Sequence, residues 1–196
     1  MKKLFITLAV LAAAAFSANA QFRVEAGVNL ASYKFTGYTT TQTTNAKPNF
    51  RVSALYDFID SADWAFETGL TLSGTTCYRT TASVDATMKA MNLDLPIRGA
   101  YTWRVTDNFW VTPSIGLYVG VGLSNKTEAA GITTDNLAEN GDLKRFRFGT
   151  DDELLLTIAQ HITIGIGYFD SLYNMCKDTD CTIKDSGVYF TVGYAF

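Results

Sequence analysis

Apolar and polar residues alternate with a period of two along most of the chain, and this pattern constrains the fold more than any other feature. Successive side chains of a β-strand point to opposite faces, so each alternating stretch predicts a strand with one apolar face. The first stretch sets one face against the other as follows: Phe22, Val24, Ala26, Val28 and Leu30 against Arg23, Glu25, Gly27 and Asn29. Eight such stretches occur, at residues 22–30, 50–58, 64–73, 91–102, 109–124, 146–158, 162–169 and 188–196. They predict an all-β fold.

The connections between these stretches are alternately long and short. The short ones are residues 59–62, 105–108 and 159–161, and the long ones, rich in Thr, Asn, Asp and Gly, are residues 33–48, 75–89, 125–144 and 170–186. Bacterial outer-membrane barrels have an even number of antiparallel strands, short periplasmic turns and longer extracellular loops. The pattern therefore predicts an eight-stranded antiparallel up-and-down transmembrane β-barrel with four loops outside the cell.

A soluble barrel such as a lipocalin also alternates, but its outer face meets water and carries many Lys and Glu residues. Here the face opposite the apolar one is nearly uncharged in the stretches at 109–124, 162–169 and 188–196, and consists of Gly, Ser, Thr, Ala, Tyr and Phe. Small residues suit the narrow interior of an eight-stranded barrel. Aromatic residues near the strand ends match the girdles at membrane interfaces. The membrane barrel is therefore favoured over the soluble one.

The first twenty residues have the pattern of a secretory signal peptide. A short cationic start is followed by an apolar run at residues 4–16 and by Ala18-Asn19-Ala20, a small-residue cleavage pattern. We therefore expect a signal peptide at residues 1–20, a single barrel domain at residues 21–196, and a location in the outer membrane. The chain has a net charge of −3, which argues against the concentrated basic face that a nucleic-acid-binding protein needs.

Charged residues of both signs fall on the inward face of several predicted strands. They are Arg23, Glu25, Arg51, Glu67, Asp94, Arg98 and Arg147. Such residues indicate either a polar translocation path or a plug of ion pairs across the lumen. The interior of an eight-stranded barrel is just wide enough for side chains to fill it, and an unpaired buried charge is costly. The plug is the favoured interpretation, with a narrow channel as the alternative.

No catalytic site is expected. Hydrolytic and acyl-transfer sites commonly use a His base beside a Ser or a carboxylate, and the single histidine, His161, falls in a predicted periplasmic turn. An enzyme acting on outer-leaflet lipid would need its base on the opposite side of the membrane. We therefore predict a protein that is not an enzyme and has no cofactor.

The cysteines predict a disulfide and no zinc site. Cys77 falls in the second long connection, and Cys176 and Cys181 fall in the fourth, where they could pair in an oxidising compartment. Cys77 would then be free or paired elsewhere. Asp178 and Asp180 lie between the paired cysteines. They could attract calcium, but a solvated acidic loop is favoured, so no metal site is expected.

Several short motifs, in this order along the chain, resemble the PorT-like outer-membrane β-barrel family of Bacteroidota, whose barrels are of OmpA and OmpX size. These motifs are Asn49-Phe50-Arg51-Val52, residues 66–70, Leu93-Asp94-Leu95-Pro96-Ile97, residues 113–120, residues 165–170 and Gly193-Tyr194-Ala195-Phe196. The resemblance covers the chain after the signal and implies the fold and the outer membrane. The closing aromatic stretch resembles the signal read by the barrel assembly machinery, carried here by Phe190, Val192, Tyr194 and Phe196.

The sixth stretch departs from this family at residues 150–153, Thr-Asp-Asp-Glu, where an apolar segment is usual. Strict alternation would direct Asp152 toward lipid, where a charge is costly. We therefore expect either a β-bulge at this point or a strand that leaves the bilayer before Asp152.

Function is expected to lie in the long loops, because loops on a rigid scaffold commonly carry binding sites. The favoured role is a non-enzymatic surface module for adhesion, interaction or scaffolding. An accessory of a protein secretion apparatus is the alternative that the PorT-like resemblance implies, followed by a lipid-modifying enzyme and a narrow channel. The expected partners are outer-membrane lipid, the barrel assembly machinery and an extracellular or secretion-system protein, but not nucleic acid.

Overall fold

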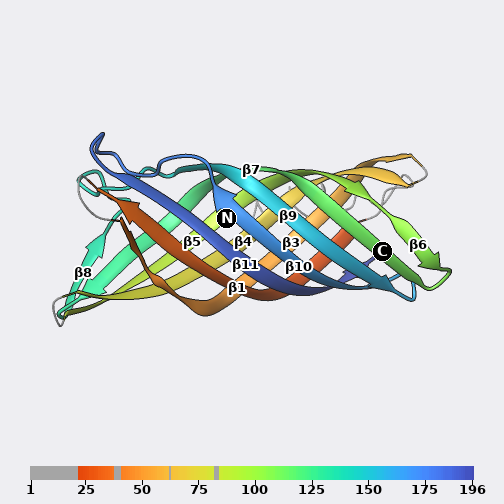
Figure 1. Ribbon diagram of the computed structural model, residues 1–196, viewed down its shortest axis with the longest axis horizontal. Coiled ribbons are helices and arrows are strands. Elements are labelled where there is room, and N and C mark those ends of the chain that lie inside the picture. Colours follow the sequence, from red (N-terminus) through yellow and green to blue (C-terminus); the bar gives the residue numbers. More distant parts are fainter. Residues whose placement is uncertain (1–21, 38–40, 62, 82–83) are drawn as a thin grey trace, which may run out of the picture.

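The computed structural model describes residues 22–37, 41–61, 63–81 and 84–196, and these residues form a closed antiparallel barrel (Figure 1). The predicted signal peptide lies outside the described residues. Eight strands form the wall: β1 (Phe22–Thr36), β3 (Asn45–Ser61), β4 (Trp64–Thr81), β5 (Val84–Tyr101), β7 (Phe109–Ala129), β9 (Phe146–Ile158), β10 (Ile162–Ser171) and β11 (Thr182–Ala195). Three short strands flank it: β2 (Thr41–Thr43) pairs with β1, while β6 (Trp103–Thr106) and β8 (Ile132–Asp135) pair with β7.

Each wall strand pairs with its neighbours in the sequence, and β11 pairs with β1 to close the barrel. That closing ladder runs without a register shift from Arg23 opposite Ala195 to Thr36 opposite Thr182. The predicted eight-stranded up-and-down barrel is therefore confirmed. In the described part of the chain, no helix is long and apolar enough to cross a membrane.

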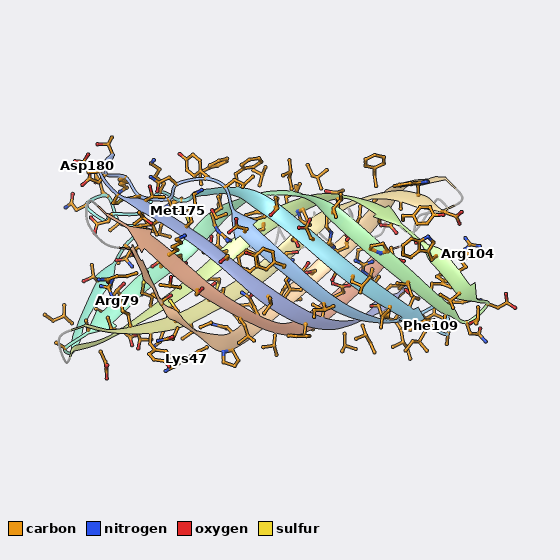
Figure 2. All side chains as sticks on the ribbon, viewed as in Figure 1. Lys47, Arg79, Arg104, Phe109, Met175 and Asp180 are labelled. Carbon is orange, nitrogen blue, oxygen red and sulfur yellow. A yellow bond between two sulfur atoms is a disulfide. The ribbon has the colours of Figure 1, made fainter. Side chains whose placement is uncertain are left out.

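The two ends of the barrel differ. At one end lie the three short turns and the two ends of the wall, where the Phe196 amide donates to the Phe22 carbonyl at 2.9 Å. The turn after β9 has positive φ angles at Ala159 (50°) and Gln160 (65°), as tight two-strand turns commonly require. Short turns and termini are periplasmic in bacterial barrels, so we call this the inner end. Arg104 lies toward it, whereas Arg79 and Asp180 lie at the outer end (Figure 2).

An apolar belt surrounds the outside of the barrel toward its inner end. It is formed by the outward side chains of residues 22–30, 50–56, 64–72, 91–97, 111–123, 146–148, 154–158, 162–168 and 188–196. Its side chains are exposed although they are large and hydrophobic, for example Leu117 at 44% and Ile164 at 43%. A continuous exposed apolar band of this kind fits lipid and not water. The outward faces therefore agree with the faces that the alternation predicted.

Strands extend into all four long connections, so the loops are shorter than predicted. Among the described residues, the longest segments outside the strands are residues 136–145 and 172–181. β4 and β5 pair up to Thr81 opposite Val84, so residues 75–81 and 84–89 belong to two paired strands. β7 has 21 residues and continues to Ala129, far beyond the 9–11 residues that a membrane strand requires. Thr has a high strand propensity. The backbone N–H and C=O groups of these extensions pair with those of neighbouring strands, so the strands can continue into water. The outer half of the barrel therefore stands beyond the belt.

β9 runs through the acidic segment without a β-bulge, the first of the two alternatives expected for it. Its pairing with β10 is regular from Ile158 opposite Ile162 to Gly149 opposite Ser171. Asp151 and Glu153 point inward and are buried, while Asp152 lies on the outer face and is partly exposed. A one-residue shift would move both inward carboxylates into the lipid face. The ion pairs of these two residues therefore hold the register that leaves Asp152 outside.

Candidate functional site

The predicted inward charges all point into the lumen, and the structure brings them together with partners that the sequence did not reveal. Arg23, Glu25, Arg51, Glu67, Asp94, Arg98 and Arg147 are all buried. The added carboxylates are Asp151, Glu153 and Asp185. The described interior thus holds four buried arginines and six buried carboxylates. Because each charge has lost its water, these groups must compensate one another.

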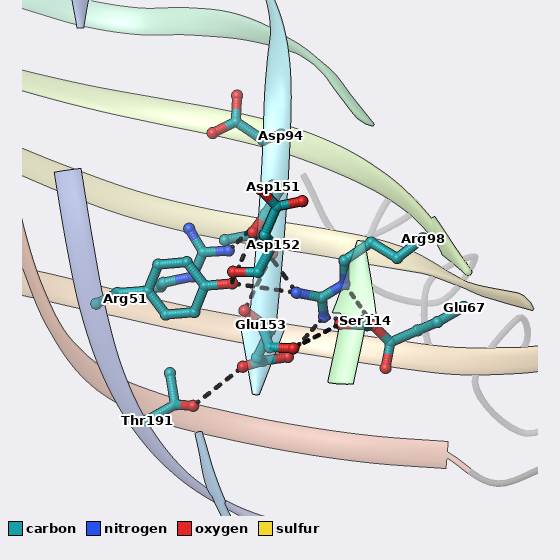
Figure 3. A network of polar contacts seen from close by, with 12 residues as sticks. Arg51, Glu67, Asp94, Arg98, Ser114, Asp151, Asp152, Glu153 and Thr191 are labelled. Carbon is teal, nitrogen blue, oxygen red and sulfur yellow. Dashed lines mark hydrogen bonds and ion pairs between the residues drawn. The ribbon is translucent and has the colours of Figure 1, made fainter. Parts of the chain in front are cut away.

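Arg98 from β5 occupies the centre of the first network (Figure 3). Its Nε donates to Glu67 Oε1 at 2.7 Å, and its Nη2 lies 2.9 Å from Glu153 Oε2. Its Nη1 donates to the Tyr189 hydroxyl at 3.1 Å and lies 3.5 Å from Asp151 Oδ1. Arg98 is 1% exposed, so one guanidinium joins side chains of β4, β9 and β11 away from water.

Arg23 extends this network across the barrel from β1. Its Nη2 lies 2.6 Å from Glu67 Oε2 and 3.2 Å from Glu153 Oε2, and its Nε lies 2.7 Å from Glu25 Oε1. Glu67 and Glu153 therefore each join two arginines, and these four side chains come from four different strands. Figure 3 shows both carboxylates beside Arg98.

Arg51 from β3 completes the first network beside Tyr189. Its Nη2 donates to Asp151 Oδ2 at 2.9 Å, and its guanidinium lies 3.8 Å from the centre of the Tyr189 ring. The Tyr189 hydroxyl donates to the other oxygen of Asp151 at 2.6 Å. Gly167 of β10 leaves room for this ring, since a Cβ atom at Gly167 would overlap it. Tyr189 thus joins the charges of β3 and β9 to β11.

Arg147 forms a second network toward the outer end. Its Nη1 donates to both oxygens of Asp94, at 2.9 and 2.8 Å, and its Nη2 donates to Asp185 Oδ2 at 2.7 Å. Its guanidinium lies 5.3 Å from the centre of the Tyr118 ring. Hydrogen bonds between two charged groups are roughly twice as strong as those between neutral groups. The lumen is therefore crossed by ion pairs at successive levels along its length.

The outer mouth is covered by two connected segments, residues 136–145 and 172–181, which we call the cap. The Lys144 amide donates to the Met175 carbonyl at 2.7 Å, and the Lys177 amide donates to the Asp142 carbonyl at 2.8 Å. The second segment contains the disulfide between Cys176 and Cys181. The side-chain Nδ2 of Asn174 donates to the Cys181 carbonyl at 2.8 Å and helps to hold this loop.

An apolar cluster inside the barrel packs cap residues against residues of the wall strands. It consists of Tyr33, Cys77, Met88, Ala90, Leu137, Leu143, Met175, Cys176 and Ile183. Cys77 was expected in a loop but belongs to β4, where it is fully buried as a free thiol. Burial raises the pKa of this thiol. The inward phase of Met88 and Ala90, in step with Asn92 and Asp94, was the sequence signal that β5 continues outward.

The remaining predicted positions lie away from this interior. His161 is exposed in the inner turn after β9, stacked on Tyr194 with ring centres 5.2 Å apart. Asp178 and Asp180 are exposed in the disulfide loop. Among the described residues, no group of three or more His, Cys, Asp or Glu residues could hold a metal ion. The residues at the end of the chain, Phe190, Val192, Tyr194 and Phe196, form an exposed stripe on the belt.

Comparisons with known proteins agree with this architecture. The family model for the outer membrane protein beta-barrel domain matches residues 4–196. The outer membrane protein OprG of Pseudomonas aeruginosa is 12% identical with a TM-score of 0.54, over 90% of this chain and 95% of that chain. Neisserial surface protein A is 13% identical with a TM-score of 0.50, over 91% and 98% of the two chains. No curated protein matches the sequence. The chain therefore belongs to the family of outer membrane protein beta-barrel domains and is an outer-membrane protein.

Proposed function

We propose that this barrel is a non-enzymatic surface protein whose outer end binds an extracellular partner, and that it is not a channel. The observation that carries the proposal is the rigid structure beyond the belt. β4, β5 and β7 remain paired past the apolar belt, and the cap, which bonds to β7, also connects β10 to β11. A rigid protruding surface loses little conformational entropy on binding, which favours recognition of another molecule.

The closed lumen supports the second part of this proposal. An ion moving through the barrel would have to separate Arg98 from Glu67 and Glu153, and Arg147 from Asp94 and Asp185. Separating such pairs leaves buried charges without partners. The networks therefore serve as a plug that stabilises the barrel while its outer end remains free to interact.

An accessory role in protein secretion is the second candidate, because the order of short motifs resembles the PorT-like family of Bacteroidota. In this role the same outer or inner surface would contact another secretion component. The stripe of Phe190, Val192, Tyr194 and Phe196 is proposed as the signal for the barrel assembly machinery in either case, since all four side chains point outward.

A shortened β4–β5 hairpin tests the proposal in cells of the native species. Residues 79–86 are deleted and Tyr78 is joined to Thr87 through Asn-Gly, a sequence that favours a tight hairpin turn. Because Tyr78 and Thr87 are already opposite each other, the remaining ladder keeps its register. We expect adhesion to immobilised extracellular-matrix protein to fall to the level of a strain without the barrel, with export of secreted proteins unchanged.

The matched control changes the inner turn, replacing Asp107-Asn108 by Asn-Gly, and is expected to adhere normally. Both variants must reach the outer membrane in amounts equal to the unaltered protein. Unchanged adhesion of the shortened variant would contradict the surface-binding role. A fall in protein export with adhesion intact would instead support the secretion role.

A further inference from the structure

A pocket of about 180 Å³ lies in the outer mouth between the barrel wall and the cap. Its apolar wall is formed by Phe35, Ala86, Met88, Leu143 and Ile183, and its polar lining by Thr44, Arg79, Thr127, Asn136 and Asp142. An aliphatic cavity of about 150 Å³ is large enough to hold benzene. The pocket therefore has the volume for one ring or a short alkyl chain, but not for a lipid tail.

The floor of this pocket separates it from the charged lumen. Met88, Leu143 and Ile183 belong to the apolar cluster inside the barrel, and none of the arginines of the two ion networks lines the pocket. Thr44, also buried in the lining, already bonds the backbone of Tyr33. A molecule that entered from outside would be held there, because the closed lumen below offers it no route inward.

The charges at the pocket distinguish among ligands of this size. Arg79 from β4 donates from Nη1 to Gln42 Oε1 at 2.8 Å, and its guanidinium lies 5.4 Å from the centre of the Phe35 ring. Both contacts are with groups that carry no charge, so neither neutralises the guanidinium. Asp142 lines the opposite, cap side and is exposed. Arg79 thus favours an anion, while Asp142 disfavours a second negative charge.

We propose that this pocket binds a small amphiphilic monoanion, with an aromatic ring or short alkyl chain against Met88 and Leu143 and a carboxylate toward Arg79. This ligand site is independent of the protein partner proposed above. Few convergent polar groups around an apolar wall are the usual composition of a small-molecule site. The bound carboxylate would form a charge-assisted hydrogen bond with Arg79, and the apolar end would leave water.

The test uses the purified barrel in phospholipid nanodiscs, with ¹³C-labelled methionine methyl groups and phenylacetate as the probe. Met88 reports on the pocket, and Met91, which is 37% exposed on the belt, reports on non-specific effects. We expect the Met88 signal to shift and saturate while the Met91 signal stays in place. No saturable shift of Met88, or equal shifts of both methionines, would overturn the proposal.

Three variants separate the pocket from its charge. Ala86→Phe fills the pocket and is expected to abolish the shift of Met88. Arg79→Gln is expected to weaken phenylacetate binding about tenfold, since a charge-assisted bond contributes on the order of 1.4 kcal/mol, without affecting phenylacetamide. Lys89→Gln removes another outer-end cation that does not line the pocket and is expected to change nothing.

A heat-dependent shift in gel mobility is the control that each variant forms a closed barrel. Binding that survives Ala86→Phe would place the probe elsewhere and overturn the site. Binding that is lost in Ala86→Phe but unchanged in Arg79→Gln would overturn the anionic class of ligand. Because these measurements use purified protein, their failure is distinguishable from a failure of the adhesion experiment in cells.

Discussion

Replacing Arg98 by Met is expected to lower the free energy of unfolding by about 3–5 kcal/mol, because removal of one partner leaves buried charges uncompensated. Arg98 is 1% exposed and contacts Glu67, Glu153, Asp151 and the Tyr189 hydroxyl. Methionine fills part of the same volume but cannot pair with any of these groups. Urea titration of the barrel folded in lipid vesicles, followed by the mobility of unheated samples on gels, measures the change.

The matched control is Lys89→Met, which removes an ion pair with Glu128 whose side chains are 54% and 47% exposed. Exposed pairs contribute at most about 1 kcal/mol, so this variant is expected to unfold close to the original midpoint. Adding Glu67→Gln to Arg98→Met is expected to recover part of the loss, because it reduces the excess of buried carboxylates over the three remaining buried arginines. Equal stability of Arg98→Met and Lys89→Met would contradict the role of the ion network.

Replacing Leu117 by Arg is expected to destabilise the barrel in lipid vesicles by about 2–4 kcal/mol, the cost of a cation at the bilayer midplane of a barrel strand. Leu117 is 44% exposed on β7, between Ile115 and Val119 on the same outward face of the belt. An arginine there would face hydrocarbon without a partner. Urea unfolding of the variant in the same vesicles measures the effect.

Ile132→Arg provides the comparison for the belt. Ile132 is 69% exposed, more than Leu117, but belongs to β8 at the outer end beyond the belt. Its substitution is expected to change the stability by less than about 0.5 kcal/mol, since a surface position in water tolerates a charge. If the two substitutions cost the same, the belt would not lie in the bilayer and the assigned membrane position would be wrong.

The period-two pattern was sufficient for the number, order and facing of the wall strands, because each strand has one face against lipid and one against the lumen. It was insufficient at the outer end, where polar composition was interpreted as loop. There the strands stand in water, so outward Thr and Lys residues replace the apolar ones while the inward phase continues at Met88 and Ala90. Following the inward phase alone would have extended β5 correctly.

The lumen was predictable in composition but not in its pairings. Arg147 faces inward, and alternation from Arg147 already places Asp151 and Glu153 on the same inward face. The same alternation places Asp152 on the outward face. Asp185 was assigned to a loop and is fully buried beside Arg147. Which carboxylate meets which arginine depends on barrel closure and strand stagger, and these bring together residues more than a hundred positions apart, as in Arg23 and Glu153.

Single-channel recording tests the central claim, that the ion networks close the lumen and leave the outer end as the functional part. The purified barrel is inserted into planar bilayers and recorded over a range of voltages in salt solution. We expect no discrete and reproducible conductance from the unaltered protein, because Arg98 bonds Tyr189 and Arg51 bonds Asp151 across the lumen, between strands on opposite sides of the wall. Discrete, reproducible openings of the unaltered barrel would contradict the claim and establish a channel.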